Sequence, residues 1–424
     1  MAAGFFLVLS VLLLTGLPIF AALTLTVFLG IELAGSTPLP LVIQRMFSGI
    51  DKFPLMAIPL FILAGNLMSH GGMSKRILRV AQMLVGTLRG GLAMTTVTGS
   101  MFFGAISGSS PATVVSVGKL ILPSMLEEGY DKRFSVGLLM ASGAMGIIIP
   151  PSIFMIIYGS VAGVSIGALF MAGLGAGAVY GAVFFLYCIY RAYRDDLPSK
   201  PMPSRHEFVY AIKDASWGLA IPVIILGGIY GGLFTPTEAA AVAVAYAIVI
   251  GLFISRELTV ATLWQVAVNS AVVTTQVMII LAAASAFSWY LTTSGVTQEV
   301  ASALLSVADN PITLLLMINL IILVAGMFLD PNSIVIILVP LVVTVAQVVG
   351  IDLVHLGVIF CVNAAIGMFT PPFGMNLFVA SSLDNVSYGE AVCGALPLVG
   401  IALIALLLVN VFPQISLWLP RALM

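Results

Sequence analysis

The hydrophobic pattern of the chain consists of long apolar stretches separated by short polar breaks. A helix needs about 20 apolar residues to cross a bilayer, and several of the stretches reach that length. They do not alternate between apolar and polar positions, as the short strands of a transmembrane β-barrel do. The pattern therefore predicts an all-α polytopic membrane protein.

The N-terminal pattern predicts scaffold helices followed by a basic amphipathic segment. Residues 4–34 are apolar and are divided near Pro18, which predicts a short helix and then a second one. The polar stretch 35–52 is expected to be a loop, and 53–70 is the next span. In 73–90 basic and apolar residues alternate, which favours an interfacial helix on the cytoplasmic side over an ordinary loop helix.

Two interruptions follow in sequence that is otherwise apolar. Residues 91–126 form two limbs joined by the helix-breaking sequence SGSSP at 107–111. Each limb is short for a full crossing, so a re-entrant hairpin is favoured over two helices joined by an external loop. The span 134–163 is broken at Gly146 and at the proline pair 150–151, because consecutive prolines remove two amide donors. Irregular backbone deep in a bilayer is tolerated where it lines a cavity, so these breaks are candidate binding sites.

The second half of the chain repeats the first. The sequence GAMGIIIPPSIFMIIYGS at 143–160 aligns with AAIGMFTPPFGMNLFVAS at 364–381, with a glycine, the proline pair and the final serine in register. The segment 311–349 corresponds to the first hairpin. The basic loop 191–214 is expected in the cytoplasm. Counting crossings from this loop gives the two copies opposite topology, as in secondary transporters built from inverted repeats, whose substrate site lies near the midplane.

This pattern divides the chain into five parts. They are N-terminal scaffold helices in 1–52, a first repeat in 53–190, a cytoplasmic loop in 191–216, further scaffold helices in 217–255 and a second repeat in 256–424. The first repeat holds a scaffold helix, the interfacial arm, a hairpin and a broken helix. The second holds a hairpin, a broken helix and a C-terminal helix.

Composition and charge narrow the possible functions. Hydrophobic residues make up 61% of the chain, charged residues make up 8%, and the mean hydropathy is +1.18, which excludes a soluble globule. The net charge is -1 and the basic residues form no single patch, so nucleic acid is not an expected partner. Cys188, Cys361 and Cys393 are expected to be packed thiols. The first residues lack the basic start of a secretory signal and are expected to remain as a membrane segment.

Broken helices supply groups that bind ions. A break leaves free amides with partial positive charge at one new helix end and free carbonyls at the other. The amides can hold an anion, while carbonyls with Ser, Thr or Asn oxygens suit a sodium ion. The candidate sodium cages are Ser107, Ser109 and Ser110 with carbonyls near Gly146, and Asp330, Asn332 and Thr370 with carbonyls near Gly367.

Two charged side chains lie within the apolar hairpins. Asp330 is at the second tip, where a role in shaping or charging the tip is favoured over that of a simple helix cap. Lys119 lies in the first hairpin. Its side chain either snorkels toward the cytoplasmic face or lies near the substrate.

Several of these motifs together resemble the large membrane subunit of tripartite ATP-independent periplasmic (TRAP) transporters. The motifs are SMFFGAISGSSPATVVSVGKLILPSM, EGYDKRFSVGLLMASGAMGIIIPPSI, FILAGNLM with GGMSKRIL, and GLFTPTEAAAVAVAYA. The resemblance covers essentially the whole chain. It implies an elevator-type ion transporter fold related to the divalent anion/sodium symporters, in which a mobile domain holds both hairpins and both broken helices.

The resemblance also implies a transport mechanism, a coupling ion and two protein partners. A sodium gradient drives uptake of an organic acid, such as a C4-dicarboxylate or sialic acid, across the bacterial inner (cytoplasmic) membrane. A soluble periplasmic substrate-binding protein delivers the substrate, and a separate small membrane subunit of about four helices supports the scaffold. Sodium is the coupling ion, and no other cofactor is expected. The protein is therefore expected not to be an enzyme.

By the same similarity the site residues separate into two sets. Sodium binding falls on Ser107, Ser110 and Gly146 in the first copy, and on Asp330, Asn332, Gly367 and Thr370 in the second. Substrate is expected between the two tips, at Ser109, Pro111, Ala112, Thr113, Pro150, Pro331 and Pro371. The second hairpin resembles the family less closely than the first.

Other functions predict different properties. A stand-alone sodium-coupled di- or tricarboxylate symporter of related fold would share the hairpins and need no binding protein. An intramembrane serine protease would need a general base, and His70, His206 and His355 all fall at predicted span ends or in loops. A channel is disfavoured because two hairpins that enter from opposite sides suit alternating access.

Overall fold

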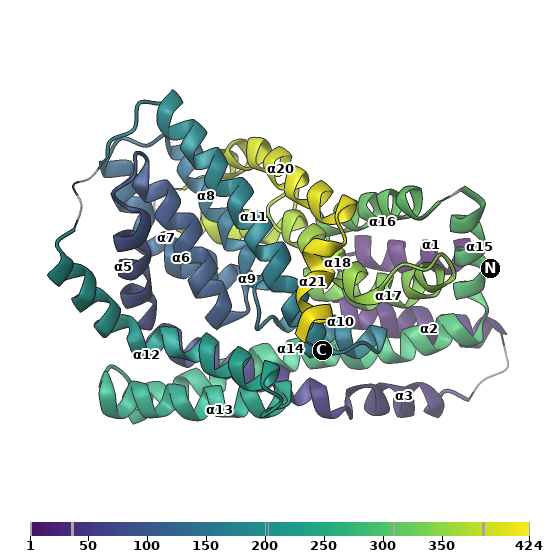
Figure 1. Cartoon of the computed structure of the whole chain (residues 1–424). Helices are drawn as coiled ribbons and strands as arrows, with labels where there is room; N and C mark the ends of the chain where they lie inside the picture. The colour runs from purple at the N-terminus through teal and green to yellow at the C-terminus, as the bar shows by residue number, and fades with distance from the viewer. Residues whose placement is uncertain are drawn as a thin grey trace.

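The structure of the chain, a computed structural model, describes residues 2–34, 38–199, 201, 203–307, 310–383 and 386–423. Within these ranges it consists of helices and contains no strand (Figure 1). Seven of the helices described are long and apolar enough to cross a membrane, or eight spans if a bent pair is included. The prediction of an all-α polytopic fold is confirmed.

The helices follow one another in four groups. The first is α1 (Ala2–Leu14), α2 (Ile19–Ala34), α3 (Pro40–Ile50), the 3-10 helix η1 (Phe53–Met56) and α4 (Ala57–His70). The second is α5 (Met73–Val85), α6 (Gly91–Ser107), α7 (Ser110–Glu127), α8 (Lys132–Gly143), α9 (Met145–Ile148), α10 (Ile153–Ala162) and α11 (Ile166–Arg194). The third is α12 (Arg205–Tyr230), α13 (Pro236–Val249), the π-helix η2 (Ile250–Ile254) and α14 (Val260–Thr293). The fourth is α15 (Val296–Val307), α16 (Pro311–Gly326), α17 (Pro331–Val348), α18 (Leu353–Gly367), α19 (Met375–Ser381), α20 (Tyr388–Val411) and α21 (Gln414–Leu423).

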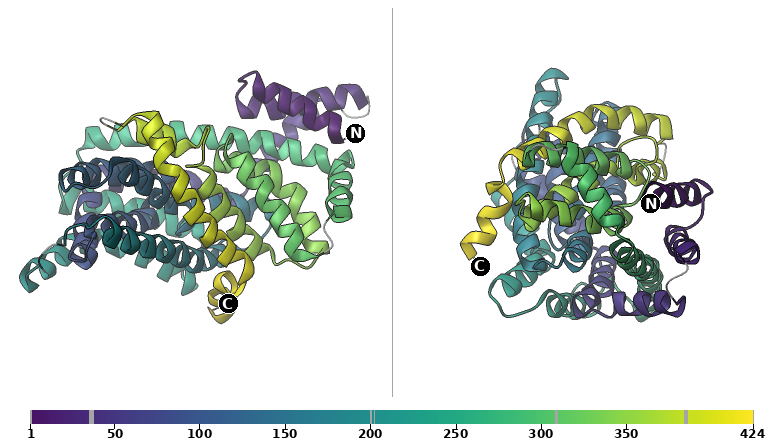
Figure 2. Two further views of the ribbon diagram at one scale, coloured as in Figure 1. Left: turned by 90° about the horizontal axis from the view of Figure 1, so that it is seen from above. Right: turned by 90° about the vertical axis from the view of Figure 1, so that its right-hand side faces the viewer.

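The helices form a long outer layer and a packed inner part. α14 runs along the length of the molecule, and α2, α3 and α4 pack against it. Figure 2 shows α1 and α2 on the outside of α14. The hairpins and broken helices lie together on the other side, where α8 packs against α20 and α11 packs against α18. The two groups of hairpins and breaks therefore share one core.

The prediction of a polar loop at 35–52 is wrong for most of this range, because α3 begins at Pro40. Proline at the first helical position has a suitable φ angle and needs no amide partner there. Val42, Met46 and Ile50 recur at helical spacing, and Val42 is fully buried. Gly49 lets α3 approach α14 closely, since a Cβ there would lie 2.0 Å from Cβ of Ser285.

The prediction of a polar loop at 191–214 is also wrong at both ends of this range. α11 continues to Arg194, and α12 already begins at Arg205. The start of α12 has a capping box, in which Ser204 and Glu207 each bond the other's backbone amide. This pairing satisfies two free amides of the first turn, so polar residues here begin a helix.

Both predicted hairpins and both predicted breaks are present. Gly108, with φ +59°, turns the chain between α6 and α7. The break between α9 and α10 bends that span by 45°. Ser152 stabilises it, since its hydroxyl caps α10 and also donates to the carbonyl of Ile147 at 2.5 Å. In the fourth group α16 and α17 form the second hairpin, and α18 and α19 flank the second break.

The two groups also repeat contacts between their helices. A Cβ on Gly104 would lie 3.0 Å from Cα of Gly146, and one on Gly326 would lie 3.0 Å from Cα of Gly367. In each group the first limb of the hairpin therefore touches the broken helix backbone to backbone. Polar side chains pair here as well: Ser100 bonds Ser142 at 3.2 Å, and the Asn363 amide donates to the Asn319 side chain at 2.8 Å. Gly104 and Gly326, and likewise Ser142 and Asn363, hold matching positions in the two groups, whereas Ser100 and Asn319 do not. The matching glycine contacts support a repeated structural unit.

Candidate functional site

A cavity of about 810 Å³ lies where the two hairpin tips come together. The tip between α6 and α7 and the start of α17 line one side, and residues of α4, α14 and the start of α2 line the rest. Predicted site residues make up much of the first side. They are Ser107, Ser109, Ser110, Pro111, Ala112, Asp330, Pro331 and Asn332. The structure therefore brings both tips, which are far apart in the sequence, to one space.

The remaining predicted residues lie outside the lining of this cavity. They are Thr113, Gly146, Pro150, Gly367, Thr370 and Pro371. Thr370 is 8% exposed, and its hydroxyl donates to the carbonyl of Ile366 at 2.7 Å. Gly146 and Gly367 provide the close helix contacts described above. Gly146 and Gly367 therefore pack against the hairpins, and the part of all six residues in binding stays a prediction.

Oxygen atoms gather at the first tip. The hydroxyls of Ser107 and Thr113 lie 3.2 Å apart. Both hydroxyls also reach the carbonyl of Ser109, at 3.2 Å from Ser107 and 2.8 Å from Thr113. Gly146 packs directly beneath, since a Cβ there would lie 2.6 Å from that carbonyl. Such a cluster of uncharged oxygens on rigid backbone matches the donors that a hard cation prefers.

The second tip carries the carboxylate of Asp330. Its Oδ2 accepts from the amides of Asn332 at 3.1 Å and Ser333 at 3.2 Å, and its other oxygen contacts the Ser333 hydroxyl. Asp330 is therefore the cap of α17 as well as part of the cavity lining. The sequence favoured a role in shaping or charging the tip over that of a simple helix cap. These two roles do not exclude each other, because one carboxylate has enough oxygen lone pairs to cap the helix and to face the cavity.

Asn376 is a central residue that the sequence reasoning missed. It lies in α19, is fully buried, and its amide donates to the Ser110 hydroxyl at 2.8 Å and to the carbonyl of Met140 at 3.1 Å. The contact joins the second break to the tip of the first hairpin. A polar residue four positions after the second proline, in a stretch that is otherwise apolar, was the available signal.

The far side of the cavity also has polar groups that were not predicted. Asn66 of α4 and Gln276 of α14 line it, and the Asn66 amide donates to the Ser270 hydroxyl at 2.9 Å. Lys119 is exposed and is not part of the lining. Among the described residues that line the cavity, Asp330 is the one charged side chain. The start of α17 is capped by the Asp330 carboxylate, whereas the start of α7, which also lies in the lining, has no side-chain cap. The amide end of α7 is therefore the part of the lining that offers positive potential to an anion.

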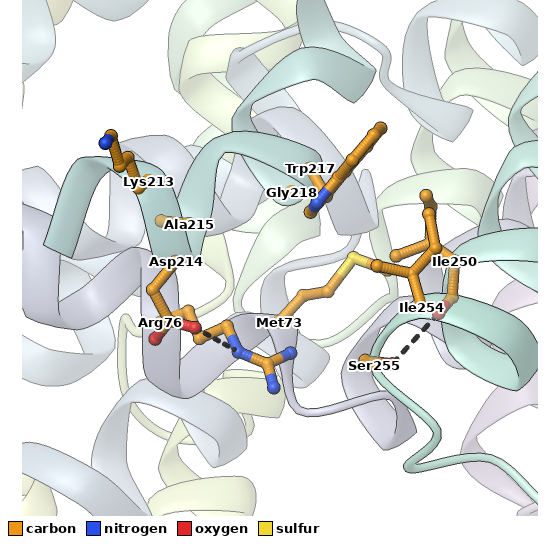
Figure 3. A pocket seen from close by; sticks show the side chains of 10 residues that line it. All are labelled: Met73, Arg76, Lys213, Asp214, Ala215, Trp217, Gly218, Ile250, Ile254 and Ser255. Atoms are coloured by element: carbon orange, nitrogen blue, oxygen red, sulfur yellow. Dashed lines mark hydrogen bonds and ion pairs between the residues drawn. The ribbon is translucent and has the colours of Figure 1, made fainter. Parts of the chain in front are cut away.

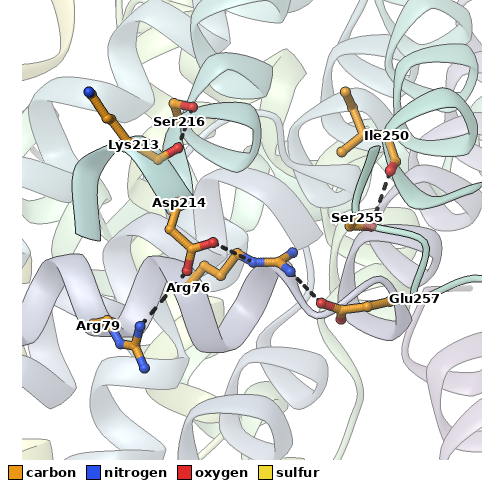
Figure 4. Close-up of polar contacts among 8 residues, drawn as sticks. All are labelled: Arg76, Arg79, Lys213, Asp214, Ser216, Ile250, Ser255 and Glu257. Carbon is orange, nitrogen blue, oxygen red and sulfur yellow. Dashed lines mark hydrogen bonds and ion pairs between the residues drawn. The ribbon is translucent and has the colours of Figure 1, made fainter. Parts of the chain in front are cut away.

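A smaller cavity of about 180 Å³ lies between α5, α12 and η2 (Figure 3). Two charged residues of its lining belong to a small ion-pair network: Arg76 donates to Asp214 at 3.1 Å and contacts Glu257, and Arg79 lies 3.9 Å from Asp214 (Figure 4). These side chains are partly exposed, and such pairs each contribute about 0–1 kcal/mol. We interpret the network as a contact that holds α5 against α12. The helix predicted at 73–90 is present over Met73–Val85, and its place at a membrane surface stays a prediction.

Known proteins resemble this chain over almost its full length. Residues 6–415 match the family described as "Tripartite ATP-independent periplasmic transporter, DctM component". The chain is 40% identical to the C4-dicarboxylate TRAP transporter large permease protein of Vibrio cholerae, over 97% of this chain and 96% of that protein. It is also 40% identical to the isethionate TRAP transporter permease protein of Oleidesulfovibrio alaskensis, over 96% of this chain but only 65% of that longer protein.

The fold also resembles a solved structure. The YdaH transporter of Alcanivorax borkumensis superposes with a TM-score of 0.65 over 87% of each chain, at 14% sequence identity. At this identity the likeness concerns the fold alone. The family match and the 40% identity along nearly the whole of a large permease show that this chain belongs to the DctM component family of TRAP transporters, a family of multi-pass membrane transporters and not of enzymes.

Proposed function

We propose that this chain is the transport subunit of a sodium-driven, binding-protein-dependent importer of an organic acid in the bacterial inner membrane. The observation that carries the proposal is the cavity of about 810 Å³ that both hairpin tips share. A site built from two repeated units is the arrangement expected of a secondary transporter. The relatives named for C4-dicarboxylate and isethionate uptake support an organic acid as the substrate.

The composition of the cavity lining supports an elevator mechanism as part of this proposal. One side consists of hairpin tips and breaks, which touch one another through glycine and asparagine contacts. The rest of the lining comes from α4, α14 and the start of α2, and Gly65 of α4 packs against the first tip at Ser107. Movement of the first side against these helices would carry the substrate without opening the packed core. We infer that α14 and the helices beside it form the scaffold, and that a small membrane subunit of about four helices binds there.

Binding-protein dependence separates this proposal from a stand-alone symporter. We expect proteoliposomes with this chain and a small membrane subunit to accumulate labelled C4-dicarboxylate only when the cognate periplasmic protein is added with sodium. Omitting either one should reduce uptake to the level of empty vesicles. Equal uptake without the binding protein would instead support a stand-alone sodium-coupled di- or tricarboxylate symporter.

Sodium coupling can be tested at the two breaks. Ser110→Ala and Thr370→Ala are each expected to raise the sodium concentration for half-maximal uptake by about tenfold, the effect of losing one interaction of about 1.4 kcal/mol. Ser302→Ala is a matched control, since its exposed hydroxyl bonds only the Glu299 carbonyl within its own helix. Unchanged sodium dependence in both test variants would contradict the assignment.

Opposite topology of the two units predicts that equivalent residues face opposite sides of the membrane. Lys75 on α5 and Gln298 on α15 hold matching positions, both are exposed, and the two helices lie at opposite ends of the molecule (Figure 1). Ser109 and Asn332 are unsuitable for this test because both line the same cavity. The native Cys393 is exposed, contrary to expectation, and must be replaced first.

In a Cys393→Ser background we expect an impermeant thiol reagent to label Lys75→Cys from the cytoplasmic side only. Gln298→Cys should be labelled from the periplasmic side only. The buried Cys188 and Cys361 need no replacement if the parent variant remains unlabelled. Labelling of both positions from one side would exclude inverted units.

A further inference from the structure

A third cavity, of about 480 Å³, lies away from the hairpin tips. It is enclosed by the start of α16, the turn between α17 and α18, the end of α20 and α21. Its rim includes Ile312, Leu316 and Val411, which are 69%, 53% and 57% exposed. Val411 ends α20, which is long and apolar enough to span a membrane, and Ile312 and Leu316 lie on α16, a shorter apolar helix. The rim of the cavity is therefore an exposed apolar surface of the kind that acyl chains cover.

His355 gives this cavity a polar inner wall. The side chain is 3% exposed and lines the cavity, and neither ring nitrogen has a hydrogen-bond partner among the residues described. A buried polar group without a partner costs about 1–3 kcal/mol, and such groups in native proteins are normally satisfied. An imidazole offers one N–H donor, which can bond a ligand oxygen in the cavity.

Two opposite charges line the same cavity without pairing. Arg421 of α21 and Asp352 before α18 are both in the lining, and no ion pair joins either one to another described residue. Oδ1 of Asp352 accepts from the amides of Val354 at 2.8 Å and His355 at 3.2 Å, and the other oxygen makes no such bond. The cavity thus offers an exposed guanidinium, an imidazole donor and a carboxylate oxygen beside an apolar rim.

We propose that this cavity binds a phospholipid whose headgroup carries a primary ammonium. The phosphate bonds Arg421, the imidazole of His355 donates to a phosphate or ester oxygen, and the ammonium donates to Asp352. The acyl chains lie along the rim beside Ile312 and Val411. A zwitterion matches two opposite charges that share a cavity, whereas a simple anion would face the carboxylate of Asp352 as a like charge.

The test is lipid retention by the full chain, measured by native mass spectrometry during stepwise delipidation. The probes are phosphatidylethanolamine, phosphatidylcholine and phosphatidylglycerol with identical acyl chains. Choline has no N–H donor, and glycerol has no positive charge. We expect one phosphatidylethanolamine to be retained about tenfold more tightly than either other lipid, the effect of one charge-assisted hydrogen bond.

Substitutions at the three polar residues of the cavity test which of them contacts the lipid. Arg421→Gln should weaken retention of phosphatidylethanolamine about tenfold. Arg194→Gln is the matched control, because this arginine on α11 is 64% exposed and lies outside the cavity. Asp352→Asn keeps a residue that caps α18 well, and it should remove the preference for phosphatidylethanolamine over phosphatidylcholine. His355→Phe should raise the unfolding temperature of the lipid-free protein and reduce the further rise caused by phosphatidylethanolamine.

Equal retention of the three lipids by the unaltered chain would overturn the proposal, and so would unchanged retention in Arg421→Gln. Displacement of the lipid by millimolar inorganic phosphate would show a site for small anions instead. If His355→Phe leaves the lipid-induced stabilisation intact, the imidazole does not contact the lipid and the assignment of that contact is wrong.

Discussion

Replacing Asn376 by leucine is expected to lower the free energy of unfolding by about 1–3 kcal/mol, because the buried Ser110 hydroxyl loses its hydrogen-bond partner, while the carbonyl of Met140 keeps the Ala144 amide as a donor. The Ser110 hydroxyl and the carbonyl of Met140 both accept from the Asn376 amide, at 2.8 Å and 3.1 Å. Leucine keeps the side-chain size and the helix, but it cannot donate. Because the contact joins the two repeated units beside the cavity, uptake should fall by more than tenfold. Thermal unfolding and vesicle uptake measure the two effects.

A double-mutant cycle separates this contact from general damage to the core. If Asn376 acts through Ser110, then Ser110→Ala combined with Asn376→Leu should cost little more than Asn376→Leu alone. Gln298→Leu, on the exposed face of α15, controls for the added apolar surface. Fully additive losses in the double variant would show that the two side chains act independently.

Adding one methyl group at Gly367 is the second change with a large expected effect. A Cβ at this position would lie 2.7 Å from Cα and 2.9 Å from the carbonyl carbon of Gly326, which are backbone atoms that cannot rotate away. Gly367→Ala should therefore reduce stability by about 1–3 kcal/mol, the usual cost of overpacking a core. It should also lower the yield of folded protein in the membrane. Thermal unfolding in detergent gives the measurement.

Gly400→Ala is the matched control, and it is expected to increase stability rather than reduce it. It lies within α20, and nothing lies within 4 Å of the added Cβ. Alanine in a helix interior is favoured over glycine by about 0.5–1 kcal/mol. Gly146→Ala in the first unit should behave like Gly367→Ala, since its Cβ would lie 2.6 Å from the Ser109 carbonyl. An unfolding temperature of Gly367→Ala equal to that of the native chain would show that the glycine contact is unimportant.

Features that depend on local rules could be predicted from the sequence. Apolar stretches of sufficient length predicted the helical membrane fold, and the Ser-Gly-Pro turn and the two proline pairs predicted the hairpins and breaks. The two wrong loop predictions, at 35–52 and 191–214, have local causes as well. Pro40 and the Ser204–Glu207 box were helix-start signals within stretches judged by polarity alone.

The sequence by itself determined that two broken, repeated helical units exist and that their tips carry the candidate chemistry. Only the tertiary structure decided which oxygens face one cavity, which glycines press backbone to backbone, and that α4, α14 and the start of α2 line the rest. The bond between Ser110 and Asn376 joins residues 266 positions apart. Local propensity contains no information about such a contact, because it arises from packing of complete helices after each has formed.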